Sequence, residues 1–359
     1  MTSRTLDAAV LDDRDGMGAL DPGGALEQAG GLGRQLRRGY RTGRDAPGLP
    51  MGDGLRAIVV CGMGGSGVAG DVLRGLYADR ISVPIVVNKG YGLPVFAGPD
   101  TLVAALSFSG NTEETLSAYG EAVARGCRVL TVSAAGLLAE RAAGDGIAHL
   151  PLPTDVPMPR MAVGDLSASL IGALEAMGLL PAASEEIEEA AALLDGLADR
   201  LGPERPMAGN TAKELAAWIG PRTPVVWGSE GLAEAPAGRL RTQVNENAKA
   251  PAFSALLPEL DHNEIEGWSA GAGEGYAVVA LRHAREHPRV GERLEATREA
   301  IAAARLDYRE VHAEGRGPLE ILFSLVMLGD FAATYLALLR GVDPTPVPVL
   351  MTLKKRLAR

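Results

Sequence analysis

The chain has 359 residues, enough for two domains of ordinary size. Hydrophobic residues make up 47% and charged residues 22%, a balance typical of globular rather than disordered proteins. Aromatic residues are only 4% and the net charge is −10. Single-strand binding needs basic grooves and stacking aromatics, so nucleic acid is not expected as a partner.

Three local features favour a cytoplasmic protein. The first seven residues include Asp7 and no apolar run, so they do not resemble a signal peptide. Segment 321–339 is the most apolar late in the chain, but Asp330 interrupts it, so we expect a buried helix rather than a membrane span. Cys61 and Cys127 have no CxxC spacing and no partners for a zinc site, and we expect free thiols.

The first part of the chain has the pattern of an α/β protein. Residues 1–54 contain a helix over 26–40, interrupted by glycines, and then a Gly- and Pro-rich loop. Short, continuously apolar runs follow, separated by glycines or by helix-length stretches. This alternation predicts βαβ units and a parallel sheet covered on both faces. The expected strands are 57–61, 85–87, 102–106, 129–132 and 148–150.

The pattern then passes through helices and starts again. A Pro-rich crossing precedes helices expected over 166–177, 184–200 and 211–219. Asn210 suits the N-cap of the third, because its side chain accepts from a free backbone N–H. Further strands are expected at 224–227, 277–281 and 307–312.

We therefore predict an α/β fold with two doubly wound parallel-sheet subdomains flanked by helices. Ligands of such folds bind at the carboxyl ends of the strands, at a switch point of the sheet. The expected divisions are an N-terminal segment 1–54, a first subdomain 55–178 that binds phosphate, a helical connection 179–222, and a second subdomain 223–359 with C-terminal helices.

A glycine-rich loop, Cys61-Gly-Met-Gly-Gly-Ser-Gly67, follows the first strand. Its glycines let the backbone approach an anion, and the next helix offers free N–H groups, so Gly64, Gly65 and Ser66 are predicted to bind phosphate. The loop also matches the dinucleotide fingerprint GxGxxG, but Asn88 stands where the ribose-binding acid is expected. A tight strand–helix turn without a ligand is the simplest alternative.

A second polar loop, Ser107-Phe-Ser-Gly-Asn-Thr112, follows another predicted strand. Ser107, Ser109 and Thr112 are neutral donors, and the loop contains no lysine or arginine. Neutral hydrogen bonds suit reversible binding of a monophosphate better than a tight nucleotide clamp. A helix N-cap would explain one such loop, but not two on neighbouring strands.

Together these loops resemble the sugar isomerase (SIS) domain, which binds phosphosugars. Two further motifs, 243–251 (QVNENAKAP) and 259–267 (ELDHNEIEG), are similar to those of bifunctional phosphoglucose/phosphomannose isomerases. The resemblance runs from about residue 55 to the C-terminus. It implies an isomerase without metal or cofactor that interconverts glucose 6-phosphate and mannose 6-phosphate with fructose 6-phosphate. It also implies a homodimer with the active site near the subunit interface.

The expected reaction assigns roles to Glu246 and Arg160. Aldose–ketose isomerisation moves a proton between C1 and C2 through a cis-enediol, so one carboxylate can act as base and then as acid. Glu246 is the predicted carboxylate, the alternative being a surface glutamate on a helix. Arg160, after the Pro-rich crossing, matches an arginine of the family and supplies positive charge for the enediolate.

Ring opening needs a proton donor and acceptor. Histidine is the side chain whose ordinary pKa lies near working pH, so His262 is predicted for this role. The resemblance implies that it reaches into the active site of the other subunit. Whether it acts there or in its own subunit stays open. The family's final helix carries a lysine that assists ring opening, and we prefer Lys354 over Lys355.

Two patterns resemble known binding sites but are not expected to bind a metal or phosphate. His283-Ala-Arg-Glu-His287 has the spacing of a zinc peptidase motif, but Pro288 would stop the helix on which both histidines must face one metal. We expect no metal site, which argues against a zinc-dependent mannose phosphate isomerase. The turn 228–231 echoes the first loop, but its Glu230 repels phosphate, so one phosphate site per chain is expected.

A non-catalytic phosphosugar sensor is the alternative function. Its phosphate loops would bind the ligand while the rest of the chain signals. Such a sensor would not need the set of Glu246, His262 and Lys354.

Overall fold

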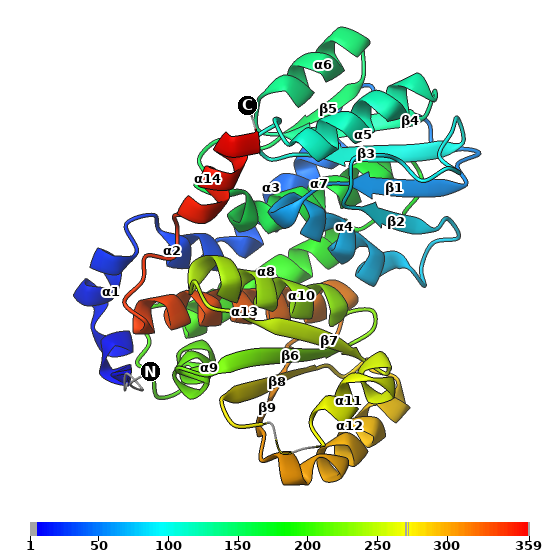
Figure 1. Cartoon of the computed structure of the whole chain (residues 1–359). Helices are drawn as coiled ribbons and strands as arrows, with labels where there is room; N and C mark the ends of the chain where they lie inside the picture. The colour runs from blue at the N-terminus through cyan, green and yellow to red at the C-terminus, as the bar shows by residue number, and fades with distance from the viewer. Residues whose placement is uncertain (1–5, 270, 272, 358–359) are drawn as a thin grey trace.

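The computed structural model describes residues 6–269, 271 and 273–357. The first five residues of the predicted N-terminal segment lie outside them. Two sheets form two α/β layers, with a thick group of helices between them (Figure 1). The strands of the first sheet lie within the predicted segment 55–178 and those of the second within 223–359. The exact division of the chain into domains stays a prediction.

The first sheet is parallel throughout, with strand order β2-β1-β3-β4-β5. Each of the five predicted strands lies inside an observed one, because buried parallel strands form continuous apolar runs. Switch points of such sheets lie where the order reverses, here at β1 and β3. The bounds are β1 Ala57–Cys61, β2 Ile85–Asn88, β3 Thr101–Leu106, β4 Arg128–Ser133 and β5 Ala148–Pro151.

The second sheet repeats this order with one strand fewer, as β7-β6-β8-β9. The three strands predicted in this half are confirmed, and β7 is an additional strand that the pattern did not indicate. It lies at the sheet edge between Pro251 and Pro258, and its first residue, Phe253, is 55% exposed. The bounds are β6 Thr223–Ser229, β7 Phe253–Leu257, β8 Tyr276–Arg282 and β9 Asp307–His312.

The helices confirm most of the expected pattern. The segment predicted over 26–40 is two helices that meet at Gly31, and the Asn210 side chain caps α9 by accepting from the N–H groups of Ala212 and Lys213. The helices are α1 Arg14–Leu20, α2 Ala25–Gly30, α3 Leu32–Arg44, α4 Gly64–Tyr77, α5 Glu113–Ala124, α6 Leu137–Asp145, α7 Val163–Ala176, α8 Ser184–Leu201, α9 Thr211–Ile219, α10 Glu234–Asn247, α11 Glu264–Gly267, α12 Pro288–Ala300, α13 Pro318–Leu339 and α14 Pro348–Leu357. Short 3₁₀ helices are η1 Ala8–Asp12, η2 Pro159–Ala162, η3 Glu259–His262 and η4 Ala302–Ala304.

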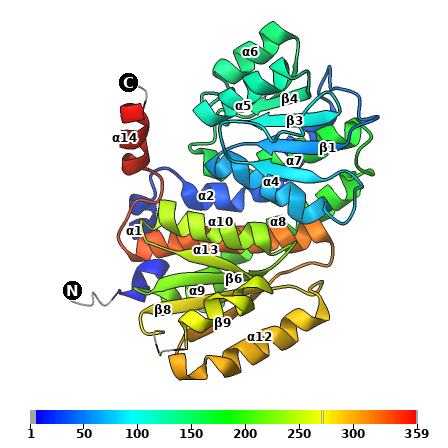
Figure 2. The same ribbon diagram turned by 45° about the vertical axis from the view of Figure 1, so that its right-hand side comes forward.

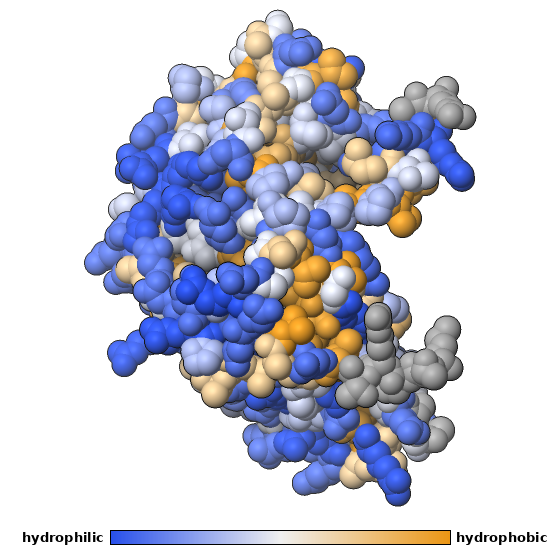
Figure 3. Space-filling view, turned by 90° about the vertical axis from the view of Figure 1, so that its left-hand side faces the viewer, coloured by the Kyte–Doolittle hydropathy of each residue, from blue (hydrophilic) through white to orange (hydrophobic). Residues whose placement is uncertain are grey.

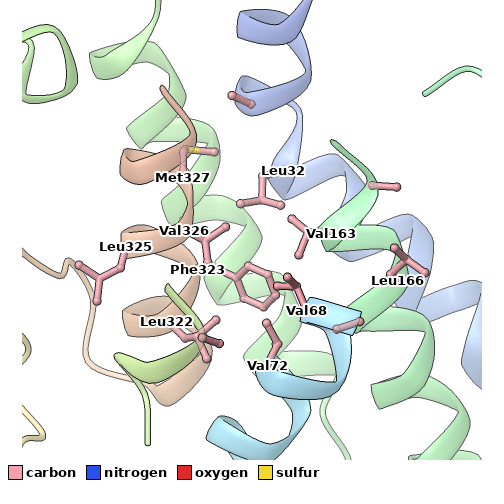
Figure 4. Packing of buried hydrophobic residues seen from close by; sticks show 14 of the residues in the cluster. Leu32, Val68, Val72, Val163, Leu166, Leu322, Phe323, Leu325, Val326 and Met327 are labelled. Carbon is pink, nitrogen blue, oxygen red and sulfur yellow. The ribbon is translucent and has the colours of Figure 1, made fainter. Parts of the chain in front are cut away.

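The main core lies between the two sheets, while the face of the molecule seen in Figure 3 is mainly hydrophilic. In Figure 4 apolar side chains of α13, such as Phe323 and Val326, pack against Val68 and Val72 of α4 and Val163 of α7. Helix α13 is long and apolar enough to cross a membrane, with a mean hydropathy of 1.9, but 94% of that window is buried inside the protein. The predicted buried helix is therefore confirmed.

The carboxyl ends of the two sheets point in opposite directions. Helix α4 starts where β1 ends, and a Cβ on Gly75, near the end of α4, would lie 2.8 Å from the carbonyl oxygen of Gly231, just after β6. The start of α4 therefore lies at the opposite end of this helix from the loop after β6. Helix α10 returns from that loop and brings its last residues back to the carboxyl edge of the first sheet.

Candidate active site

The two polar loops after β1 and β3 are in contact. Ser66 is buried in the first turn of α4, and its Oγ accepts a hydrogen bond from the N–H of Phe108 at 3.1 Å. Ser107 Oγ donates to Thr112 Oγ1 at 2.8 Å and accepts from the N–H of Thr112 at 3.2 Å. Ser107 therefore orients Thr112. The hydroxyl hydrogens of Ser66 and Thr112 stay available for an anion.

The start of α4 supplies backbone donors to the same place. The N–H groups of Ser66 and Gly67 donate to the Met63 carbonyl, at 3.1 and 3.2 Å. The first N–H groups of a helix have no partner within it, which leaves those of Gly64 and Gly65. Gly64 has φ +51°, a left-handed value that favours glycine. These donors and the helix dipole form a site suited to phosphate.

Ser109 lies exposed at the tip of the second loop. Its Oγ accepts from the N–H of Asn111 at 3.3 Å, so its hydroxyl hydrogen is also free to donate. Gly110 has φ +70°, and a Cβ there would lie 1.7 Å from the carbonyl oxygen of Ala135. The loop is thus pressed against the turn after β4 and holds Ser109 in a defined position.

Arg160 packs directly against the first loop. A Cβ on Gly65 would lie 2.6 Å from the Arg160 Cα and 2.8 Å from the Pro159 carbonyl carbon. Only glycine allows this approach of two backbones. The conformation of the glycine-rich loop and the position of Arg160 are therefore coupled.

The Arg160 guanidinium is buried, with 3% of its side chain exposed. Its Nε donates to Asn247 Oδ1, and its Nη2 donates to the carbonyl oxygens of Pro344 and Thr345, each at 2.8 Å. Burial lowers its pKa from the ordinary arginine value, while Glu246 opposes that shift. The guanidinium remains a cation at neutral pH.

Glu246 lies at the end of α10 and faces this cation. Its Oε2 is 3.4 Å from Arg160 Nη1, a buried nitrogen with no hydrogen-bond partner among the described residues. The carboxylate side chain is 26% exposed, so a ligand can reach it. Glu246 therefore lies between the buried Arg160 Nη1 and the surface from which a ligand can enter.

Lys249 completes the positive side of the site. It has a left-handed φ of +51°, and its Nζ donates to the carbonyl oxygens of Glu246 and Pro344, the latter at 3.3 Å. Burial, with the nearby Arg160 guanidinium, lowers the Lys249 pKa from its ordinary value. Lys249 thus ties the end of α10 to the segment that follows α13.

The other two predicted catalytic residues are elsewhere in the described chain. His262 is exposed in η3, after β7, at the carboxyl edge of the second sheet. Glu246 lies before β7 and His262 lies after it. A strand of five residues is roughly 16 Å long, so β7 holds the two residues apart. Lys354 is exposed on α14, which has no buried residue and projects from the helical layers (Figure 2).

Two residues beneath the site were not predicted from the pattern. Arg239 of α10 donates to the Arg160 carbonyl oxygen at 2.7 Å, and it forms a buried ion pair with Asp330 of α13. Asp330 is an acid within a long apolar helix, and buried charges need partners. That contrast is the sequence signal that points to a structural or functional pair.

The zinc-like motif lies between β8 and α12 rather than on one helix. His283 is buried and lies 3.2 Å through Nε2 from Ser229 Oγ, while His287 is exposed and caps α12. A cavity of about 820 Å³ lies at this end of the second sheet, and Glu230 and Arg285 are among its lining residues. The predicted repulsion of phosphate by Glu230 stays a prediction.

Comparisons with known proteins identify similar chains. Residues 208–357 match the family of the bacterial phospho-glucose isomerase C-terminal SIS domain. The chain is 34% identical over 335 residues to the bifunctional phosphoglucose/phosphomannose isomerase of Caldicellulosiruptor bescii, covering 93% of this chain and 98% of that protein. The protein of the same name from Aquifex aeolicus is 33% identical over 306 residues, with 85% and 91% covered.

Two solved structures share the fold. A hypothetical protein from Thermus thermophilus has a TM-score of 0.72 at 15% identity, with 96% of this chain and 94% of that chain covered. The tagatose-6-phosphate ketose/aldose isomerase from Escherichia coli has a TM-score of 0.65 at 16% identity, with 89% and 94% covered.

Proposed function

Because the chain belongs to the family of bifunctional phosphoglucose/phosphomannose isomerases, we propose that it interconverts glucose 6-phosphate and mannose 6-phosphate with fructose 6-phosphate. The observation that carries this proposal is the placement of the Glu246 carboxylate 3.4 Å from the buried Arg160, which itself packs on the phosphate loop. A base, a fixed cation and a phosphate site in contact are the groups that this reaction needs. The substrates are metabolites of the cytoplasm, where we expect the protein to act.

The phosphate group is held by neutral donors. Ser66, Ser109 and Thr112 each have a hydroxyl hydrogen to donate, and the N–H groups of Gly64 and Gly65 add two more donors. Ser107 acts by orienting Thr112. Hydrogen bonds to a charged phosphate are stronger than neutral ones, so these donors bind the substrate without a cation in the loops.

Glu246 moves the proton between carbon atoms. It takes the proton from C2 of the open-chain aldose, and the electron pair of that C–H bond forms the C1–C2 double bond of the enediol. The protonated carboxyl group returns the proton to C1, while a hydroxyl proton passes from O2 to O1. Electrons stay within the substrate, so no redox partner is needed.

Arg160 stabilises the charge that develops on the enediolate oxygens. Its Nη1 is fixed by the three hydrogen bonds of the other guanidinium nitrogens and lacks an acceptor of its own. A preorganised cation in a buried site costs little reorganisation during the reaction. One base serves both C2 epimers if the open chain rotates about C2–C3.

Ring opening is assigned to His262 and Lys354 in a homodimer. The separation of His262 from Glu246 within one chain supports its action in the partner's site. Helix α14 supports the same arrangement, because it exposes Val349, Met351 and Leu353 among other apolar side chains, which a second copy would cover.

The test is a coupled assay of the purified protein after EDTA treatment, with glucose 6-phosphate and mannose 6-phosphate as separate substrates. Turnover of both supports the bifunctional, metal-independent reaction. Turnover of one narrows the specificity and keeps the mechanism. No turnover of either, with fructose 6-phosphate still bound, would contradict the proposal and favour the non-catalytic sensor.

A further inference from the structure

A buried ion pair lies directly behind the proposed catalytic groups. Arg239 of α10 forms two parallel hydrogen bonds with Asp330 of α13, from Nε to Oδ1 and from Nη2 to Oδ2, each at 2.8 Å. The two side chains are 3% and 9% exposed. Gln243 Nε2 donates to Asp330 Oδ1 at 3.0 Å, so the carboxylate has a third donor.

This pair is connected to the site on two sides. Arg239 Nη2 also donates to the backbone carbonyl oxygen of Arg160 at 2.7 Å, which links α10 and α13 to η2. Arg239 and Glu246 are seven residues apart on α10 and therefore lie on similar sides of that helix. Arg239 thus joins the helix that carries Glu246 to the backbone that carries Arg160.

The four charges balance. Arg160 and Arg239 are positive, and Glu246 and Asp330 are negative, so the cluster has no net charge when all four are ionised. A buried ion pair is weak support for stability, because well-packed apolar residues of similar volume often stabilise a protein as much or more. Its hydrogen bonds instead define how three elements meet, which is what a catalytic arrangement requires.

We propose that Arg239 and Asp330 are positioning residues for the isomerisation, which hold Arg160 and α10 so that Arg160 Nη1 faces Glu246. Neither touches the substrate. Asp330 also balances the charge of Arg239, which would otherwise add to that of Arg160. This inference rests on the proposed function.

The decisive variant is Asp330→Asn. It keeps the shape of the side chain but leaves the Arg239 charge without a counterion and weakens its orientation. We expect kcat to fall by about 10- to 100-fold, since small misplacements of catalytic groups cost up to about 10²-fold. We expect KM to change less than kcat, because the hydrogen bonds of Asp330 are with Arg239 and Gln243 of α10 and reach the phosphate loop only through Arg160.

The pH profile distinguishes positioning from a general loss of stability. The charged groups that face Glu246 are Arg160 of η2 and Lys249 of the loop after α10, with Arg239, Asp330 and Asp343 further away. Without the Asp330 charge the surroundings are more positive, which favours the ionised carboxylate of Glu246. The acidic limb of the kcat/KM profile should therefore move to lower pH in Asp330→Asn.

A double variant separates charge from geometry. Arg239→Gln combined with Asp330→Asn removes both charges and leaves two amides that can bond to each other. We expect its acidic limb to return to the wild-type position while kcat stays reduced, because the glutamine is too short to hold the Arg160 carbonyl as arginine does. Arg239→Lys is a milder variant if Asp330→Asn does not fold, and it should also lower kcat.

A matched control is the ion pair between Arg38 of α3 and Asp165 of α7. It is also doubly hydrogen-bonded, at 2.8 and 2.7 Å, and Asp165 is buried. Asp165→Asn should lower the melting temperature but leave kcat and the pH profile of the folded protein unchanged.

The outcomes are distinguishable. An inactive wild-type protein overturns the proposed function itself. An active wild type together with a folded Asp330→Asn variant of normal kcat and normal pH profile overturns the positioning role. The positioning role is also overturned if both Asp330→Asn and Asp165→Asn differ from wild type only in stability.

Discussion

Replacement of Gly65 by alanine tests the coupling between the phosphate loop and Arg160. The added Cβ would lie 2.6 Å from Arg160 Cα, 2.7 Å from Arg160 N and 2.8 Å from the Pro159 carbonyl carbon. Non-bonded carbon atoms prefer separations of about 3.5–4.0 Å, so the two backbones must part by roughly 1 Å. All three contacts are with backbone, and a side-chain rotation cannot relieve them.

A displacement of this size moves Arg160 away from Glu246 and distorts the phosphate donors together. We expect kcat/KM for glucose 6-phosphate to fall by about 10²-fold, with a lower kcat and a higher KM. The assay is steady-state kinetics with both hexose 6-phosphates, and thermal denaturation monitors folding.

Gly120→Ala is the matched control for this glycine substitution. Gly120 lies in α5, and a Cβ there would meet no atom within 4 Å. It should leave kcat/KM unchanged and stabilise the helix slightly. A folded Gly65→Ala variant with wild-type kcat and KM would refute the coupling of loop and arginine.

Three further expectations follow from the same structure. Thr112→Val should raise KM by about 10- to 100-fold with kcat nearly kept, since one hydrogen bond to a charged group contributes about 1.5–3 kcal/mol. Steady-state kinetics measures this, and an unchanged KM would contradict the phosphate role. Calorimetric titration with inorganic phosphate should give one site per chain, and a second site would show that Glu230 does not exclude phosphate from the second sheet. Burial lowers the His283 pKa below its ordinary value of 6.5, so the unfolded chain binds the proton first and stability is lost as pH falls through that range. The melting temperature of His283→Gln should therefore fall less than that of wild type between pH 7.5 and 5.5. An equal fall would show that His283 does not cause this pH dependence.

The fold was largely predictable because its central strands, such as β1 and β3, are buried along their whole length. Continuous apolar runs mark such strands, as in 57–61 and 102–106, whatever their distant neighbours are. Strand β7 escaped prediction since it is a short edge strand with an exposed Phe253. Its place is set by pairing with β6, which short-range patterns do not record.

The site was predictable where it is local in sequence. The two polar loops consist of consecutive residues between a strand and a helix, so their hydrogen-bond donors can be identified from the sequence, and their binding of phosphate stays a prediction. The contacts of Arg160 with Glu246 and with the Pro344 and Thr345 carbonyl oxygens join segments more than 80 residues apart. No local pattern specifies such contacts, and the family resemblance carried the assignment of Arg160.

Conversion of fructose 6-phosphate in D₂O by EDTA-treated protein tests the central claim most directly. Proton transfer through Glu246 places the migrating hydrogen on a carboxyl group, where it exchanges with solvent before some of the returns. Proton transfer therefore predicts that deuterium accumulates at C2 of both glucose 6-phosphate and mannose 6-phosphate over repeated turnovers, detected by NMR. It also predicts that Glu246→Gln slows their formation by about 10²-fold or more. Aldose products that stay without deuterium at C2 after many turnovers to equilibrium, or a Glu246→Gln variant as fast as wild type, would contradict the account.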